Sequence, residues 1–182
     1  LLGDYNPSGR LPVTVYKSLE QLPGFEDYGM QGRTYRYFSG DPLYEFGYGL
    51  SYTSFRYTNL QIPIRIATND PLEFSVDVTN TGNMDGDEVV QVYISHEGLP
   101  FVTPIRSLKG FKRVSLKKGE TKTIRFLLES DDLSVVKDDG RVIVMPCTIK
   151  MSVGGKQPDM QSLKQGTVVE KNVDLVGDPV NL

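Results

Sequence analysis

Leu72-Glu-Phe-Ser-Val-Asp-Val78 alternates apolar with polar side chains without interruption. Successive side chains of a β-strand point to opposite faces, so this pattern predicts a strand with one face buried and the other in solvent. Similar apolar runs follow at residues 90–94, 124–128, 142–144 and 149–153. Pro146 separates the last two runs and cannot donate a hydrogen bond to a neighbouring strand, so it marks a break or an edge.

Turn-forming residues separate these runs at short intervals. They are rich in glycine, asparagine and aspartate, and lie at residues 80–86, 117–119, 138–140 and 154–155. About seven strands over about 100 residues indicate an all-β fold, an immunoglobulin-like or fibronectin type III-like sandwich. Residues 156–182 are more polar, and within them residues 167–176 form either a further strand or a docked tail.

Aromatic residues gather near the start of the chain, where twelve of the eighteen Tyr and Phe fall in residues 1–55. This region has no sustained helical period, and only residues 11–16 show the pattern of a short strand. Such a segment cannot build a closed core, so its rings need a partner surface outside it. Because the chain begins at Leu1 rather than Met, we expect it to be a piece of a longer polypeptide.

Composition excludes several classes of protein. Twenty Lys and Arg against 23 Asp and Glu give a net charge of −3, which provides no basic surface for nucleic acid. No stretch approaches the roughly 18–20 consecutive apolar residues of a membrane span. The single Cys147 excludes an internal disulfide and any zinc site built on two cysteines, and a packed thiol is its expected state.

Paired acids are the first catalytic candidates, because hydrolysis of a glycosidic bond needs two carboxyl groups, about 5–5.5 Å apart in retaining enzymes. Three groups occur: Asp131 with Asp132, Asp138 with Asp139, and Asp85 with Asp87 and Glu88. All of them lie at loop or turn positions between apolar runs, and adjacent residues of a strand point to opposite faces. We therefore expect these acids to be solvated turn residues.

Metal and nucleophile sites have little support. His96 is the only histidine, which excludes a multi-histidine metal site, and no Gly-x-Ser-x-Gly sequence accompanies it. We expect His96 to be a surface loop residue at a strand end. Residues 81–92 faintly resemble a calcium loop, but Thr81 and Val92 stand where that loop requires acids. No metal ion or cofactor is expected.

Gly32-Arg-Thr-Tyr-Arg-Tyr-Phe38 is the segment whose composition best suits a ligand. Flat aromatic rings can bind the apolar face of a sugar, and the forked donors of arginine can bind its hydroxyl groups. Arg33, Tyr35 and Arg36 are therefore candidate substrate-binding residues. The alternative is a strand used for inter-domain packing, with its tyrosines on one face.

Five blocks of sequence together resemble glycoside hydrolase family 3, the β-glucosidase and β-xylosidase group. They cover most of residues 3–155 in the family's order and are Asn6-Pro-Ser-Gly-Arg-Leu-Pro-Val-Thr14, Gly32-Arg-Thr-Tyr-Arg-Tyr-Phe38, Pro42-Leu-Tyr-Glu-Phe-Gly-Tyr-Gly-Leu-Ser-Tyr-Thr53, Val78-Thr-Asn-Thr-Gly82 with Gly86-Asp-Glu-Val-Val-Gln-Val-Tyr93, and Leu108-Lys-Gly-Phe-Lys-Arg113 with Gly119-Glu-Thr121. The chain departs from the family at Met145-Pro-Cys147, where relatives commonly have Glu-Pro-Gly. This departure questions the turn there and leaves the fold untouched.

In that family a catalytic barrel precedes an α/β sandwich domain and then a fibronectin type III-like domain. The resemblance implies that residues 1–54 are the C-terminal remnant of the α/β sandwich domain with a linker. Residues 55–155 would be the fibronectin type III-like sandwich, and residues 156–182 a C-terminal tail that could add one strand. The aromatic residues near the boundary would pack between the two domains; they are Phe46, Tyr48, Tyr52 and Phe55.

The family consists of retaining enzymes with an Asp nucleophile in the first domain and a Glu acid/base usually in the second. Neither motif occurs in these 182 residues, so the resemblance implies a chain without catalytic residues. It implies the non-catalytic C-terminal region of an exo-acting β-glycosidase in carbohydrate degradation, which supports the catalytic domains. Its partners would be those upstream domains and, through the parent enzyme, an oligosaccharide substrate.

The segment Gly32-Arg-Thr-Tyr-Arg36 resembles the β-xylosidase branch more than the β-glucosidase branch, so xylosides are the expected substrate class. The family also implies a periplasmic or extracellular location, with the export signal upstream of this chain. A carbohydrate-binding or adhesion module is the alternative function. Against it, sugar platforms need flat exposed rings, and the chain has no Trp.

Overall fold

The structure is a computed structural model that describes residue 3 and residues 5–182. Its strands are β1 (Phe55–Gln61), β2 (Arg65–Ala67), β3 (Leu72–Asn80), β4 (Gly86–Glu97), β5 (Ser107–Leu116), β6 (Thr121–Leu128), β7 (Val135–Val136), β8 (Val142–Val144), β9 (Cys147–Gly154), β10 (Val168–Val176) and β11 (Val180–Asn181). Its helices are short: α1 (Thr34–Tyr37), α2 (Met160–Gln165), and the 3-10 helices η1 (Leu19–Gln21) and η2 (Ser130–Leu133).

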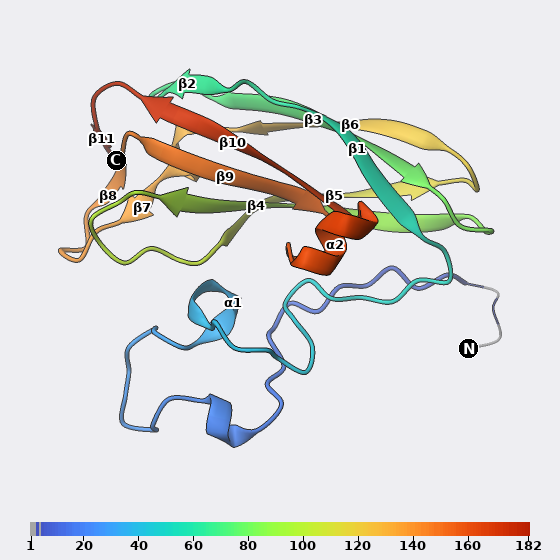
Figure 1. Ribbon diagram of the computed structural model, residues 1–182, viewed down its shortest axis with the longest axis horizontal. Coiled ribbons are helices and arrows are strands. Elements are labelled where there is room, and N and C mark those ends of the chain that lie inside the picture. The colour runs from blue at the N-terminus through green and yellow to red at the C-terminus, as the bar shows by residue number, and fades with distance from the viewer. Residues whose placement is uncertain (1–2, 4) are drawn as a thin grey trace.

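Two of the sheets pack face to face as a sandwich (Figure 1). One has the strand order β1-β3-β6, and the other has the order β2-β10-β9-β4-β5. Neighbouring strands run antiparallel except β2 and β10, which are parallel. A third, small sheet with the order β11-β8-β7 lies at one end of the sandwich.

The apolar core lies between the two large sheets. In β3, the alternate residues Leu72, Phe74, Val76 and Val78 are buried. Phe74 lies directly opposite Phe126 of β6, and the two rings stack with their centroids 5.3 Å apart. The strands predicted at residues 72–78, 90–94, 124–128, 142–144 and 149–153 are confirmed.

The two large sheets contain eight of the eleven strands in the described part of the chain: seven lie within residues 55–155, and the eighth is β10. Three strands that the pattern does not predict, β2, β7 and β11, have three residues or fewer, which is too short for a clear alternation. Strand β5 is long, but it is an edge strand with mostly exposed or half-buried side chains. Edge strands are commonly polar, so β5 lacks the pattern that marks a core strand.

Residues 156–182 contribute to the sandwich. Helix α2 begins after Asp159, whose carboxylate accepts a hydrogen bond from the Ser162 N–H at 2.7 Å. It ends at Gly166, which has a φ of 69° and turns the chain back toward the sheet. Strand β10 then lies between β2 and β9. Of the two alternatives for residues 167–176, the structure has the strand.

The segment before Phe55 forms no sheet of its own among the residues described. The predicted strand at residues 11–16 is wrong, since only one bridge, between Val15 and Tyr44, is present. Pro12 has no N–H to donate, so the pairing is interrupted there. The flanking Leu11 N–H still donates to the carbonyl oxygen of Tyr48 at 2.8 Å.

Residues 34–37 form a single helical turn, α1, so the strand that the packing alternative predicted for residues 32–38 is wrong, although Tyr35 does pack against Phe46 and Tyr93. Thr34 has a φ of 53°, a left-handed conformation that is rare for a β-branched residue. A strand needs consecutive residues in the extended conformation, and the left-handed conformation of Thr34 interrupts them.

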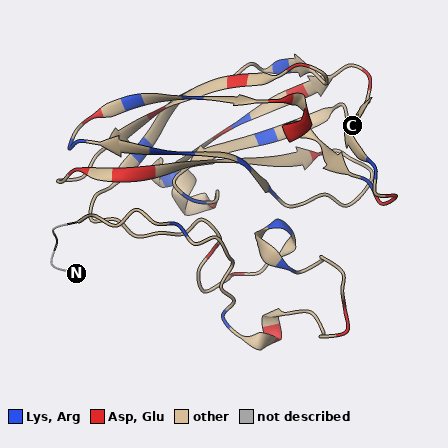
Figure 2. Ribbon diagram, turned by 180° about the vertical axis from the view of Figure 1, so that it is seen from behind, with Lys and Arg blue, Asp and Glu red and all other residues tan. Residues whose placement is uncertain are grey.

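The N-terminal segment runs along the outside of the sandwich, below the five-stranded sheet in Figure 1. Lys and Arg are intermixed with Asp and Glu along the strands and are not sorted to one face (Figure 2). No helix in the described part of the chain is long and apolar enough to cross a membrane.

Candidate functional site

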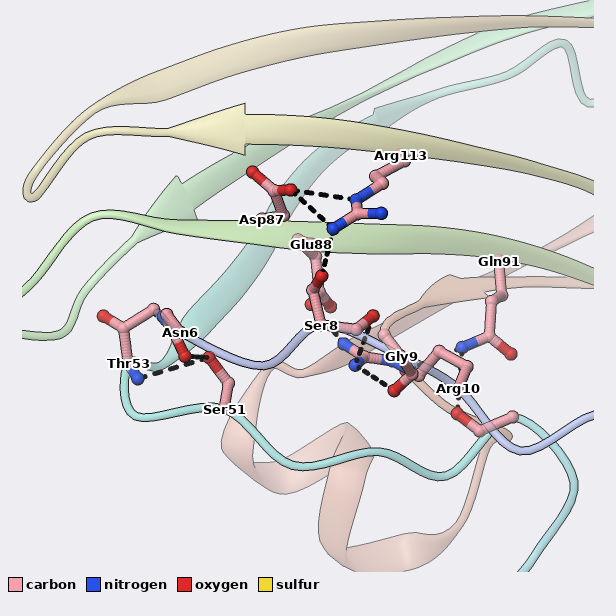
Figure 3. A network of polar contacts seen from close by, with 12 residues as sticks. Asn6, Ser8, Gly9, Arg10, Ser51, Thr53, Asp87, Glu88, Gln91 and Arg113 are labelled. Atoms are coloured by element: carbon pink, nitrogen blue, oxygen red, sulfur yellow. Dashed lines mark hydrogen bonds and ion pairs between the residues drawn. The ribbon is translucent and has the colours of Figure 1, made fainter. Parts of the chain in front are cut away.

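The candidate site is a buried polar joint between residues 6–10 and the end of the sandwich (Figure 3). Arg10 extends its guanidinium group to the carboxylate of Glu88 on β4, with Nη2 2.5 Å from Oε2. Its Nε donates to the carbonyl oxygen of Gly155, just after β9, at 3.2 Å. The Arg10 side chain is only 12% exposed, so one residue ties the N-terminal segment to two parts of the sandwich.

Glu88 is the anionic partner in this joint and is 3% exposed. It shares the inward face of β4 with Val90 and Val92. Its second carboxylate oxygen, Oε1, accepts a hydrogen bond from the Tyr57 hydroxyl at 2.7 Å. Burial raises the pKa of Glu88, and the positive charge of Arg10 opposes that rise. Both carboxylate oxygens therefore have partners inside a desolvated ion pair.

The expectation that Glu88 is a solvated turn residue is wrong. Strand β4 begins at Gly86, so Glu88 already lies within the sheet. The sequence contained one signal, the two-residue spacing from Val90, which places both side chains on one face. The partner that makes a buried carboxylate tolerable, Arg10, lies 78 residues away in the sequence.

The other acids of the three groups lie at the surface or partly exposed. Asp87 pairs with Arg113, with the guanidinium Nη2 2.8 Å from Oδ2. Asp132 is part of η2. Asp139 lies in the turn between β7 and β8, where hydrogen bonds from Arg141 lower its pKa to about 2. None of these contacts brings two carboxylates together.

The outward face of β4 forms the second half of the joint. Gln91 donates from Nε2 to the carbonyl oxygens of Gly47 and Gly155, at 3.1 Å and 2.8 Å. The Tyr93 hydroxyl donates to Gln91 Oε1 at 2.6 Å. Gln91 and Tyr93 are both buried, so their polar groups fix the backbone of the N-terminal segment on the sheet.

Asn6 holds the two ends of the N-terminal segment together. Its Oδ1 accepts hydrogen bonds from the Tyr52 N–H at 2.8 Å and from the Ser51 hydroxyl at 3.1 Å. Its Nδ2 donates to the carbonyl oxygen of Asp85, in the turn before β4, at 3.1 Å. One amide side chain thus links the start of the segment, its end and the sandwich.

The boundary aromatic residues lie in different environments. Phe46 is half-buried and stacks on Tyr35, with the ring centroids 4.2 Å apart. Tyr48 is also half-buried. Phe55 begins β1 and belongs to the sandwich core. Tyr52 is 54% exposed and stacks on no other ring among the residues described.

The three candidate substrate-binding residues do not converge on one point. Arg33 donates from Nε to the carbonyl oxygen of Gly29, within its own loop, at 3.0 Å. The Tyr35 hydroxyl accepts a hydrogen bond from the Leu108 N–H of β5 at 3.1 Å. The Arg36 side chain is exposed and makes no hydrogen bond within the described part of the chain.

His96 lies inside β4 and is half-buried, so the expectation of a surface loop residue is wrong. Its Nε2 is 3.0 Å from the carbonyl oxygen of Leu133. The difference arises because β4 continues to Glu97 and keeps His96 in the sheet. Burial lowers the pKa of His96 below its ordinary value.

We expect the free energy of unfolding to fall as the pH is lowered from 7 to 5. The folded-state pKa of His96 is lowered, so the unfolded chain takes up the proton first. The stability that neutral His96 contributes is therefore complete above about pH 6.5, the unfolded value, and is lost below it. Urea midpoints at the two pH values measure this step, which His96→Gln should reduce. An equal step in that variant would contradict the assignment.

Cys147 is half-buried at the start of β9, and burial raises the pKa of its thiol to about 11. A thiol with this pKa is protonated at neutral pH and is a poor nucleophile. Among the residues described, no three His, Cys, Asp or Glu side chains gather closely enough to hold a metal ion.

Two protein-family models match this chain. The model of the glycosyl hydrolase family 3 C-terminal domain matches residues 1–52, and the model of the fibronectin type III-like domain matches residues 88–157. The polar joint lies between these two matched regions, because Arg10 belongs to the first and Glu88 to the second.

Similar proteins are glycosidases by name. A xylan 1,4-β-xylosidase of Xylanibacter ruminicola is 47% identical over 134 residues, which cover 73% of this chain and 15% of the relative. A periplasmic β-glucosidase of Salmonella typhimurium is 34% identical over 180 residues, which cover 92% of this chain and 23% of that relative. A solved structure of a β-glucosidase from Kluyveromyces marxianus, in complex with glucose, matches with a TM-score of 0.81 and 30% identity. The match covers 98% of this chain and 22% of that chain. The chain spans about a quarter or less of the length of these relatives.

Proposed function

Because this chain belongs to glycoside hydrolase family 3, in which it matches the C-terminal region, we propose that it is the non-catalytic part of a retaining, exo-acting β-glycosidase. Its role is to support the catalytic domains of the same polypeptide. The Arg10–Glu88 ion pair is the observation that carries this proposal. A buried pair costs desolvation and is sensitive to geometry, so it holds the two matched regions in one defined orientation.

The N-terminal segment also carries apolar side chains that the sandwich leaves exposed. They are Leu19, Phe25, Tyr28, Leu50 and Tyr52. An exposed group of large apolar side chains marks an interaction surface. We infer that upstream domains of the polypeptide cover these residues, and that Phe46, Tyr48 and Tyr52 belong to the packing between the domains, whereas Phe55 packs within the sandwich core next to it.

The proposed substrate class is β-xylosides. The relative with 47% identity is a xylan 1,4-β-xylosidase, and the segment Gly32-Arg-Thr-Tyr-Arg36 resembles that branch of the family. Of the three candidate residues, Arg36 alone keeps an exposed side chain without a hydrogen bond among the residues described. We therefore propose Arg36 as the residue of this chain that contacts substrate in the parent enzyme, with Arg33 and Tyr35 positioning its loop.

We also propose that the parent enzyme acts in the periplasm or outside the cell. The Salmonella typhimurium relative is named a periplasmic β-glucosidase and aligns with 92% of this chain. Large carbohydrate polymers are outside the cell, so an enzyme that trims their oligosaccharides is useful there.

The chain alone should not hydrolyse an aryl β-xyloside, whereas the full-length polypeptide should. The family's motifs for the Asp nucleophile and the Glu acid/base do not occur in this sequence, so we expect a rate no higher than that of buffer. Release of the aryl group, followed by absorbance at equal protein concentrations, measures this difference. If the chain alone reached a rate near that of the full-length protein, the proposed non-catalytic role would be wrong.

A further inference from the structure

A cleft of about 610 Å³ opens where the loop before β1 faces the sandwich. We call it the joint cleft; its walls are Thr14, Tyr35, residues 38–45, Tyr48, Ile105, Arg106 and residues 156–159. Figure 1 shows how these segments meet: the loop after α1 passes below the start of β5 and the turn that leads into α2. Its volume is within the range of about 300–1,000 Å³ typical of ligand sites.

Aromatic rings line one side of the joint cleft. Tyr44 is 44% exposed there, and its ring centroid lies 5.2 Å from that of Tyr48. The rings are tilted by 39°, so they do not cover each other as a parallel stack would. Tyr35 and Phe38 complete this side. Partly exposed rings provide flat apolar surface for a ligand that itself has an apolar face.

Hydrogen-bonding groups line the opposite side. Arg106 donates from Nη1 to Gln157 Oε1 at 3.0 Å, which leaves other guanidinium donors available. Lys156 lies between two carboxylates, 2.9 Å from Glu45 Oε1 and 2.7 Å from Asp159 Oδ2. This side therefore offers both donors and acceptors that are held in place by one another.

The charges of the cleft favour a neutral ligand. Glu45 and Asp159 face two cations, Arg106 and Lys156, and the third carboxylate of the lining, Asp41, is paired with Lys17. These charges balance, so neither an anion such as a phosphate or uronate nor a cation would meet an excess of opposite charge, and Lys156 already lies between two of the acids. A polyhydroxylated neutral molecule can use both signs of group.

A second hollow of about 420 Å³ continues the cleft, because both are lined by Ile105, Arg106, Pro158 and Asp159. Its other walls are mainly polar and include His96, Lys150 and Glu170. The two hollows form one groove with an aromatic end and a polar end. This shape suits an extended ligand of several similar units.

From this lining we propose that the joint cleft binds a short neutral oligosaccharide. One sugar ring packs on Tyr44 and Tyr48, and its hydroxyl groups bond to Arg106 and Asp159. The polar hollow receives the next unit. The inference stands on the cleft itself: it does not depend on which domain performs hydrolysis, and it places a saccharide site within the present 182 residues.

The test is a titration of the 182-residue chain with xylotriose and, separately, cellotriose, followed by amide chemical shifts in NMR spectra. We expect saturable shifts at residues 35–48 and 156–159. Tyr44→Ala should weaken binding about tenfold or more, as expected when an aromatic anchor is truncated. Tyr44→Phe keeps the ring and should stay within about threefold of the original chain.

Tyr52→Ala is the matched control, because Tyr52 is also an exposed tyrosine of the N-terminal segment but does not line the cleft. It should bind within about twofold of the original chain. Absence of saturable shifts with either sugar would overturn the inference, and so would equal losses in Tyr44→Ala and Tyr52→Ala. A chain that is inactive and also binds no sugar would refute this inference while leaving the proposed function intact. A chain that hydrolyses the glycoside and also binds the sugars at this cleft would refute the proposed non-catalytic role while leaving this inference intact.

Discussion

Arg10→Ala should lower the free energy of unfolding by about 3–5 kcal/mol, the loss typical of removing one partner from a buried ion pair. The change leaves the carboxylate of Glu88 in a position that is 3% exposed, with only the Tyr57 hydroxyl as a side-chain partner. It also removes the donor to the Gly155 carbonyl oxygen. Urea unfolding at pH 7, monitored by circular dichroism, measures the loss.

The N-terminal segment should also detach in this variant, because Arg10 is one of its main anchors. Limited proteolysis should then cut residues 24–32 faster than in the original chain. Arg113→Ala is the matched control: Arg113 pairs with Asp87 and also bonds to Ser8 of the segment, but its side chain is 54% exposed. Exposed ion pairs contribute little to stability, so we expect a much smaller loss in Arg113→Ala. Equal losses in the two variants would show that the burial of the Arg10–Glu88 pair does not matter.

Gly47→Ala should cost about 2–4 kcal/mol, from two separate sources. Gly47 has a φ of +81°, a conformation that any other L-residue adopts with strain. A Cβ atom there would lie 2.2 Å from Gln91 Oε1 and 2.7 Å from the Tyr93 hydroxyl oxygen, so these buried groups would have to move. Thermal unfolding of the purified variant gives the loss as a lowered midpoint.

Gly98→Ala separates the two sources. Gly98 has nearly the same φ, +80°, but a Cβ atom at that position would meet nothing within 4 Å. It should show the backbone strain alone, about 1–2 kcal/mol. If Gly98→Ala lowered the free energy of unfolding as much as Gly47→Ala, the close approach of the N-terminal segment to β4 would contribute nothing to the loss in Gly47→Ala.

The sequence predicts those parts of the fold that depend on local pattern. Leu72 to Val78 alternate because one face of β3 is buried, and any sandwich of this kind imposes that alternation. Strand β5 escapes prediction because an edge strand with solvent on one side needs fewer apolar residues. Likewise, Pro12 interrupts a pairing that the residues around it would otherwise make.

The candidate site is harder to predict, because its members are adjacent only after folding. The residues around Glu88 in the sequence are typical of a turn, so Glu88 is predicted to be exposed. It can be buried only because Arg10 pairs with its carboxylate. The backbone carbonyl oxygens of Gly47 and Gly155, which bind Gln91 and Arg10, carry no side-chain signal at all. A resemblance to a family identifies such segments together, whereas local periodicity treats each one alone.

The position of β10 has a consequence for biosynthesis. Residues 168–176 are translated after every other strand of their sheet, yet they lie between β2 and β9 and complete the hydrogen bonding of both. While the ribosome still holds these residues, the nascent sheet lacks an inner member and exposes two unpaired edges. Final assembly of this sheet must therefore wait until residues 168–176 have left the ribosome, and a premature stop codon before Val168 would leave the sheet without its inner strand.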